Sequence, residues 1–167
     1  NDYDQHLARF LGRHGYETVL CGIQHEAPAD EEIGYSLILR GERAGKHDDL
    51  ANAVSASAYI KNRSADRPLF LSFGMHSTHR EFPKPAPGEI RADFLLPPPA
   101  LPDNPATRED MAGFVASAKV MDECVGIVME ALEQAGMADQ SLIIYTTDHG
   151  IAFPKMKGTL KDGGTGV

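Results

Sequence analysis

The chain has 167 residues, of which 42% are hydrophobic and 24% are charged, so a globular fold with a real core is expected and disorder is not. No apolar run approaches the roughly 18 to 20 residues that cross a bilayer, so no membrane-spanning segment is expected. Because 16 basic residues stand against 24 acidic ones, the net charge is −8, which opposes nonspecific binding to nucleic acid or to an anionic membrane.

Both ends of the sequence look cut. The first residues of the chain already predict an amphipathic helix followed by a strand, and the last residues lie in a glycine-rich stretch. We therefore expect an internal segment of a longer protein, and a signal peptide, if there is one, would lie outside it. The compartment and the oligomeric state stay open for the same reason.

The first half of the chain predicts two helices that alternate with two strands. Apolar residues at helical spacing predict a helix over residues 4–14, and a strand follows at about 18–23. An alanine-rich stretch with an aspartate at its start predicts a helix over 48–64, and the apolar run at 68–74 predicts a second strand.

The second half begins with a long loop. Eight of the eleven prolines lie between residues 80 and 105, and proline suits neither helix interiors nor central strands. A helix is predicted to begin at Asn104-Pro105 and to end at Gly136, and the apolar run from Leu142 to Tyr145 predicts a third, buried strand. A loop of this length between core elements indicates function, with a domain boundary as the alternative.

Alternating helices and apolar strands predict an α/β fold with a largely parallel sheet flanked by helices. We expect residues 1–167 to form part of one such domain, with the loop 80–105 inside it. Cys21 and Cys124 lack neighbours that would form a zinc or redox motif, so both are expected to be buried free thiols. A disulfide between them is the alternative.

Chemistry-bearing residues follow all three predicted strands. The first strand leads into Gln24-His25-Glu26, the second into His76-Ser77-Thr78-His79-Arg80, and the third into Asp148-His149. Ligands of open parallel sheets bind beyond the carboxyl ends of the strands, so these positions predict one shared site. A single histidine there is more often structural, and Glu26 and Arg80 are expected to be solvated or structural.

Lysines follow in a glycine-rich segment after the third predicted strand. Lys157 can pair with a tetrahedral oxyanion in such a loop, whereas Lys155 and Lys161 read as solvated surface residues. Neither a phosphate-binding Gly-x-x-x-x-Gly-Lys motif nor a Gly-x-Ser-x-Gly elbow occurs.

Four ordered motifs resemble the sulfatase family, within the alkaline-phosphatase superfamily. "LGRHGYETVLCGIQH" is similar to the family's "LKEAGYxTxxxGKWH", and "LFLSFGMHSTHREF" to its "FFLxxxxxDPHxPF". "LIIYTTDHG" resembles "xxxFTSDNG", and "KGTLKDGGTGV" resembles "KGxLYEGGxRVP". The "HSTHR" and "GIAFP" segments lean toward the heparan N-sulfatase-like branch. The resemblance implies an alkaline-phosphatase-like α/β fold, of which this chain is an incomplete part.

The resemblance also implies roles for five residues. Asp148 and His149 match the positions that coordinate a divalent cation, with His149 standing where many members have asparagine. Lys157 matches the lysine that contacts the sulfate, and His25 and His79 match histidines that line the sulfate pocket. The implied cation is calcium, with manganese or zinc as alternatives because a nitrogen ligand suits them better.

Two departures from the family pattern matter. Ile23 stands where the family usually has the lysine of its "GKWH" motif. No Cys-x-Pro-x-Arg or Ser-x-Pro-x-Arg occurs, so the nucleophile, a formylglycine in the family, is expected in an upstream part, and this chain alone should be inactive. The expected parent hydrolyses sulfate esters or sulfamates of a small molecule or glycan. The alternatives are a metal-dependent phosphoester or phosphonate hydrolase and a non-catalytic protein that binds sulfated sugars.

Overall fold

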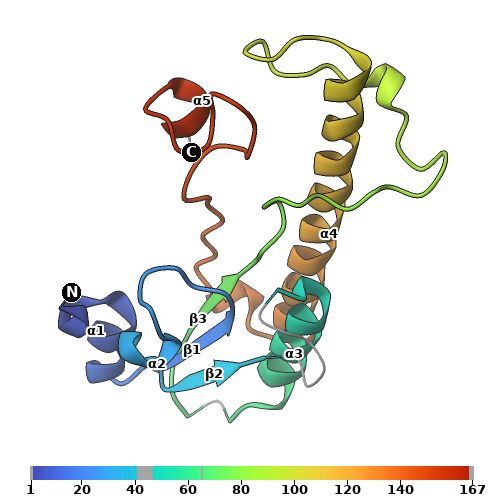
Figure 1. Cartoon of the computed structure of the whole chain (residues 1–167). Coiled ribbons are helices and arrows are strands. Elements are labelled where there is room, and N and C mark those ends of the chain that lie inside the picture. Colours follow the sequence, from blue (N-terminus) through green and yellow to red (C-terminus); the bar gives the residue numbers. More distant parts are fainter. Residues whose placement is uncertain (1, 41–46, 65, 166–167) are drawn as a thin grey trace. The chain divides into compact units, whose positions relative to one another are not determined.

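The computed structural model describes residues 2–40, 47–64 and 66–165 (Figure 1). The chain divides into two compact units. The first unit contains Asn1–His76 and Glu123–Gln140, and the second contains Ser77–Asp122 and Ser141–Val167. In chain order the elements are η1 (Tyr3–Gln5), α1 (Leu7–Arg13), β1 (Glu17–Gly22), α2 (Asp30–Ile33), β2 (Leu37–Leu39), α3 (Asp49–Asn62), β3 (Leu69–Gly74), η2 (Ala92–Phe94), α4 (Pro105–Gln134), η3 (Ala138–Gln140) and α5 (Asp162–Thr165).

The first unit is built on a parallel sheet with strand order β2-β1-β3 (Figure 1). Val19 of β1 lies opposite Leu37 of β2 on one side and Leu71 of β3 on the other. The central strand is buried, whereas every residue of β3, at the edge of the described sheet, is only half-buried. The predicted α/β class with a parallel sheet is confirmed.

Helices α1 and α3 pack against this sheet mainly through small side chains, such as Ala8 of α1 and Ala53 of α3. Leu20 of β1 and Ile60 of α3 are among the largest fully buried side chains, and alanines of α3 let the helix approach the strand closely. Asp48 caps α3, because its carboxylate accepts a hydrogen bond from the Ala51 N–H at 3.0 Å. None of the helices in the described residues is both long and apolar enough to cross a membrane.

Both cysteines are buried free thiols, as predicted. The Cys21 thiol donates to the backbone carbonyl of Asn52 at 3.2 Å. Burial raises the pKa of Cys21 to about 11 and has the same effect on Cys124. The two thiols therefore stay protonated and unreactive at neutral pH.

The second unit contains the loop 80–105, the first part of α4 and the chain after Ser141. The loop has no strand and only the short helix η2, as its prolines predict. Asn104 caps α4 by accepting a hydrogen bond from the Thr107 N–H at 3.0 Å. Three aromatic rings, Phe82, Phe114 and Phe153, pack together with centroids 5.7 to 6.0 Å apart and join the loop, the helix and the last segment.

The predicted buried strand from Leu142 to Tyr145 is wrong in this structure. These residues form no strand, and their exposed fractions are 87% for Leu142, 48% for Ile143, 76% for Ile144 and 61% for Tyr145. An isolated extended segment leaves its backbone groups unpaired, so an apolar run becomes a strand only beside another strand. The described part of the second unit offers none.

Because the segment from Leu142 to Tyr145 is exposed, we expect substitutions in it to have little effect on stability. Ile144→Ala should change the free energy of unfolding of the chain by less than about 0.5 kcal/mol, because the side chain is 76% exposed. The matched control Leu20→Ala should cost about 2–5 kcal/mol, since Leu20 is fully buried. Urea unfolding followed by circular dichroism measures both. A loss near 2 kcal/mol for Ile144→Ala would show that the segment is buried after all.

Candidate functional site

The carboxyl ends of β1 and β3 lie in close backbone contact at two glycines, Gly22 and Gly74. Gly22 has a φ of 84°, and a Cβ there would lie 2.0 Å from the carbonyl oxygen of Gly74. A Cβ on Gly74 would lie 1.9 Å from the carbonyl oxygen of Ile23. The Ile23 N–H donates to that Gly74 oxygen at 3.0 Å. The two strands therefore release their following segments at one edge of the sheet, where His25 and His76 come next in the chain.

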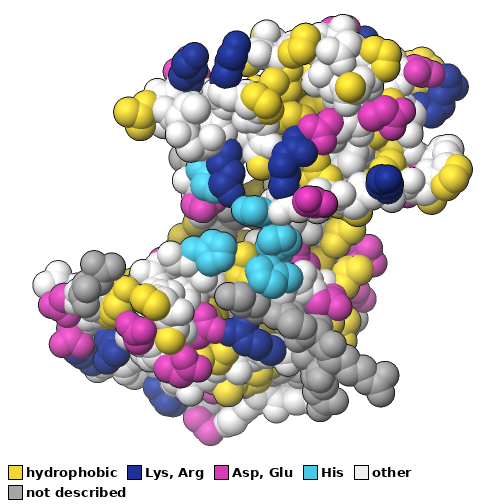
Figure 2. Space-filling model, in the orientation of Figure 1, with side chains coloured by type: hydrophobic (Ala, Val, Ile, Leu, Met, Phe, Trp, Pro, Cys, Tyr) yellow, Lys and Arg dark blue, Asp and Glu magenta, His cyan; other side chains and the backbone are white. Residues whose placement is uncertain are grey.

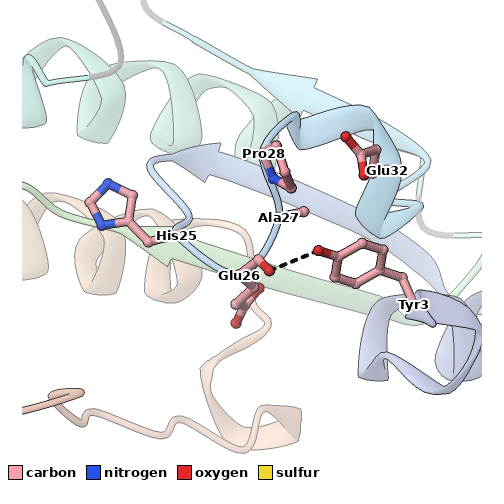
Figure 3. A pocket seen from close by; sticks show the side chains of 6 residues that line it. All are labelled: Tyr3, His25, Glu26, Ala27, Pro28 and Glu32. Carbon is pink, nitrogen blue, oxygen red and sulfur yellow. Dashed lines mark hydrogen bonds between the residues drawn. The ribbon is translucent and has the colours of Figure 1, made fainter. Parts of the chain in front are cut away.

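His25 lies in a shallow cavity of the first unit with a volume of about 620 Å³, lined also by Tyr3, Glu26 and Glu32 (Figure 3). The Tyr3 hydroxyl donates to the backbone carbonyl of Glu26 at 3.1 Å. Figure 3 shows the His25 imidazole pointing away from Tyr3. Gln24 fixes this turn, because its side-chain oxygen accepts from the Glu26 N–H at 2.8 Å.

A pair of histidines occupies the same edge of the first unit. The Nδ1 atoms of His47 and His76 are 3.0 Å apart, so one ring donates and the other accepts. The backbone N–H of His76 also donates to Asp49 Oδ1 at 2.8 Å. His76 is thus held by α3 as well as by β3.

His79 and Arg80 open the second unit after the second predicted strand. His79 is exposed, and its Nδ1 lies 2.5 Å from the carbonyl oxygen of Arg80. Because a carbonyl only accepts, His79 Nδ1 donates this hydrogen bond and carries a proton. This hydrogen bond orients the imidazole against the backbone of the next residue.

Arg80 ties three segments of the second unit together. Its guanidinium makes a bidentate ion pair with Asp110 of α4, with Nη1 donating to Oδ1 at 2.9 Å. Its Nε–H donates to the carbonyl of Ala152 at 2.6 Å. The guanidinium also lies over Phe82 and Phe153, 4.4 and 5.0 Å from the ring centroids. The hydrogen bond with Asp110 raises the pKa of Arg80, so the side chain stays cationic.

Asp148 and His149 place a carboxylate and an imidazole side by side, two kinds of group that can bind a metal. His149 Nε2 lies 3.5 Å from Asp148 Oδ2, and the Asp148 side chain is 80% exposed. His149 Nδ1 donates to the carbonyl of Gly150 at 2.8 Å. In the neutral ring that bond leaves the Nε2 lone pair on the side of the carboxylate, and it is the arrangement that metal-binding histidines adopt.

These two residues fit a divalent cation as part of a site. Among residues 2–40, 47–64 and 66–165, no three His, Cys, Asp or Glu side chains lie close enough together to hold a metal ion. A carboxylate and an imidazole are suitable donors, but calcium takes six to eight oxygens and zinc usually four ligands. Asp148 and His149 can therefore supply only part of a coordination shell.

Close backbone packing fixes the segment that carries Lys157. The Gly150 N–H donates to the carbonyl of Gly164 at 3.0 Å, and a Cβ on Gly150 would lie 1.8 Å from the carbonyl oxygen of Gly163. The Lys157 N–H donates to the carbonyl of Ile151 at 3.2 Å. Gly150 is thus required by close approach and not only by a bend in the chain.

Comparison with known proteins identifies the family. A family model described as Sulfatase matches residues 1–167. The chain belongs to the sulfatase family. Human (Homo sapiens) N-sulphoglucosamine sulphohydrolase is 31% identical over 123 residues, and the match covers 60% of this chain and 24% of that protein. An ulvan-active sulfatase of Formosa agariphila is 24% identical over 112 residues, 64% of this chain and 22% of that protein.

A third relative of this sulfatase chain is an endo-4-O-sulfatase of Bacteroides thetaiotaomicron, which is 27% identical over 106 residues. That match covers 56% of this chain and 21% of the relative. The chain thus spans about a quarter of the length of the curated relatives it matches. The resemblance to sulfatases expected from the four motifs is confirmed.

The structure of this sulfatase chain places four of the five predicted site residues in one unit. His79, Asp148, His149 and Lys157 belong to the second unit, and His25 belongs to the first. Arg80 donates a hydrogen bond to Ala152, which lies between His149 and Lys157 in the sequence, and so links that segment to the one that carries His79. Sequence reasoning treated Arg80 as structural or solvated but missed its partner Asp110, because nothing in the sequence pairs two residues 30 positions apart.

Proposed function

We propose that this chain is part of a longer sulfatase, called here the parent protein, that hydrolyses a sulfate ester or sulfamate. The observation that carries the proposal is the match of residues 1–167 to the sulfatase family. In this proposal the whole chain belongs to one sulfatase-like α/β domain, with the loop 80–105 inside it. The substrate class is a sulfated small molecule or glycan, and the alkaline-phosphatase-like fold is completed by the rest of the parent protein.

Five residues of the chain have roles in the proposed reaction. Asp148 and His149 bind part of a divalent cation's shell, and calcium is the proposed ion, with manganese or zinc as alternatives. When bound, the cation offsets negative charge on the sulfate oxygens. Lys157 adds a second positive charge beside the same oxygens. His79 or His25 donates a proton to the leaving oxygen or nitrogen as its bond to sulfur breaks.

The attacking group must come from outside these residues. The chain contains no Cys-x-Pro-x-Arg or Ser-x-Pro-x-Arg, and neither cysteine can replace that motif, because Cys21 and Cys124 are buried with raised pKa values. We therefore propose a formylglycine nucleophile in the parent protein and no turnover by this chain alone.

The test of the proposed function is sulfate release by the parent protein. Purified parent protein is given an N-sulfated disaccharide, an O-sulfated disaccharide and an aryl phosphate, with and without a chelator. We expect sulfate release that the chelator abolishes. Release of phosphate alone would replace the proposal with a phosphoester hydrolase. Binding of the sulfated sugars without turnover would identify a non-catalytic relative, which Ile23 in place of the family lysine favours.

A partial metal site makes a prediction for the 167-residue chain itself. Calcium should bind to it with a Kd no tighter than about 1 mM, since Asp148 and His149 are too few ligands for a closed shell. Calorimetric titration with calcium and with manganese measures the affinity, and Asp148→Asn provides the matched control. Micromolar calcium binding that Asp148→Asn abolishes would contradict the proposed incomplete site.

A further inference from the structure

A groove of about 880 Å³ lies in the second unit, and its lining includes Phe82 and Phe153, the two rings that the Arg80 guanidinium covers. Its walls come from the loop 80–105, the first turns of α4 and the segment after Ile151. The residues that matter here are Phe82, Lys84, Leu101, Glu109, Phe153 and Lys155. Its volume is that of a pocket for a ligand of one or two sugar rings, and apolar walls with a few charged groups are typical of such pockets.

The charges in the groove favour an anion. Within the described residues, neither Lys84 nor Lys155 has a carboxylate at ion-pair distance. Asp110 also lines the groove, but its charge is offset by the bidentate pair with Arg80. Of the charged groups that line the groove, this leaves one carboxylate, Glu109, and two lysines, so the net charge of the lining is positive. Figure 2 shows Lys and Arg side chains standing among apolar ones on the surface of the molecule.

Lys155 is held in place by an unusual backbone conformation. Its φ is 66°, in the left-handed region that a residue with a Cβ rarely adopts. The Thr159 hydroxyl shares its one proton between the carbonyl oxygens of Met156, at 2.9 Å, and Lys155, at 3.1 Å. Lys155 therefore has a backbone fixed by its neighbours, while its exposed side chain lines the groove.

The groove adjoins the candidate site within the same unit. Phe82 and Phe153 form part of its wall and also pack on the Arg80 guanidinium, next to His79. Lys155 is two residues before Lys157 in the same glycine-rich segment. A ligand in the groove would thus be the neighbour of a group bound near His79 and Lys157.

We propose that this groove binds a second acidic sugar of a glycan, one whose sulfate or carboxylate group pairs with Lys84 and Lys155. The choice of a glycan rests on the proposed function, but binding to the groove needs no turnover. The apolar walls would cover the faces of the sugar ring, and Glu109 would accept hydrogen bonds from its hydroxyls. The proposed activity would then be directed to chains of at least two sugars.

The experiment measures binding of a heparin tetrasaccharide to the 167-residue chain by calorimetry at low and moderate salt. We expect the double variant Lys84→Gln/Lys155→Gln to weaken binding about tenfold, as two partly exposed ion pairs are lost. Glu109→Gln should strengthen it about twofold, because a repelling charge is removed. The matched control Lys61→Gln removes an exposed lysine of α3, outside the groove, and should leave the affinity unchanged.

Three results would overturn the proposal. The first is equal affinity in the wild type and the double variant. The second is an equal loss in Lys61→Gln, which would indicate diffuse attraction without a groove. The third is equally tight binding of an uncharged maltotetraose, which would show that charge is not recognised. Because none of these measurements needs hydrolysis, failure of the parent protein to release sulfate leaves them interpretable and concerns only the proposed function.

Discussion

Replacing Lys157 with alanine in the parent protein should lower kcat for sulfate release about a hundredfold or more, which corresponds to roughly 3 kcal/mol of transition-state stabilisation. The proposed reaction develops negative charge on oxygen atoms as the bond to sulfur breaks. An ammonium group positioned beside those oxygens stabilises that charge more in the transition state than in the substrate. Steady-state kinetics on an aryl sulfate measures the effect.

The structure indicates that a lower kcat in Lys157→Ala would come from the lost ammonium group and not from a disturbed fold. Lys157 is half-buried, and its described anchor is a backbone bond from its N–H to Ile151, which alanine retains. Lys161→Ala is the matched control, because Lys161 is an exposed lysine of the same glycine-rich segment. A rise in KM with unchanged kcat would contradict the prediction, since it would mean that Lys157 binds substrate and transition state equally.

Gly150→Ala should disrupt the segment that follows Asp148 and His149. The added Cβ would lie 1.8 Å from the Gly163 carbonyl oxygen and 2.8 Å from its carbon, and backbone atoms cannot move aside as a side chain can. We expect a cost of about 1–3 kcal/mol for forcing a methyl group into this contact. Since the two proposed metal ligands, Asp148 and His149, precede Gly150 directly, we expect turnover by the parent protein to fall about a hundredfold as well.

The matched control is Gly126→Ala in α4, where a Cβ meets no atom within 4 Å. That variant should gain up to about 1 kcal/mol, because alanine is the better helix former. Hydrogen exchange of the Gly150 amide, which donates to Gly164 at 3.0 Å, reports the local effect in the 167-residue chain. Unchanged protection of that amide in Gly150→Ala would mean that the close approach to Gly163 is not needed.

The local sequence pattern was sufficient to predict most helices and strands of the first unit. The predicted helices at 4–14 and 48–64 and strands at 18–23 and 68–74 agree with α1, α3, β1 and β3 to within a few residues. The apolar spacing predicted that the helices exist, but it matches their buried faces only in part, because Leu7 and Phe10 of α1 and Val54 of α3 are exposed. The helices and strands that sequence reasoning missed are short: α2 has 4 residues and β2 has 3, too few to show a period.

For the candidate site too, the sequence predicted some features and missed others. Strand ends and family motifs predicted roles for His79, Asp148, His149 and Lys157, four residues that belong to the second unit. They did not identify Asp110, which pairs with Arg80 across 30 positions, or the contact between Gly150 and Gly163. A motif records which residue types follow each other, whereas these contacts depend on segments that meet only after folding.

By itself, the sequence determined the α/β class, the long helix α4, the buried free thiols and the family, because each rests on local periodicity, composition or an ordered motif. Only the tertiary structure decided the state of Leu142 to Tyr145 and the part played by Arg80. An apolar run is buried as a strand only if a neighbouring strand accepts its backbone hydrogen bonds. A charged side chain likewise becomes a structural link only when folding brings a carboxylate, a carbonyl and two aromatic rings around it.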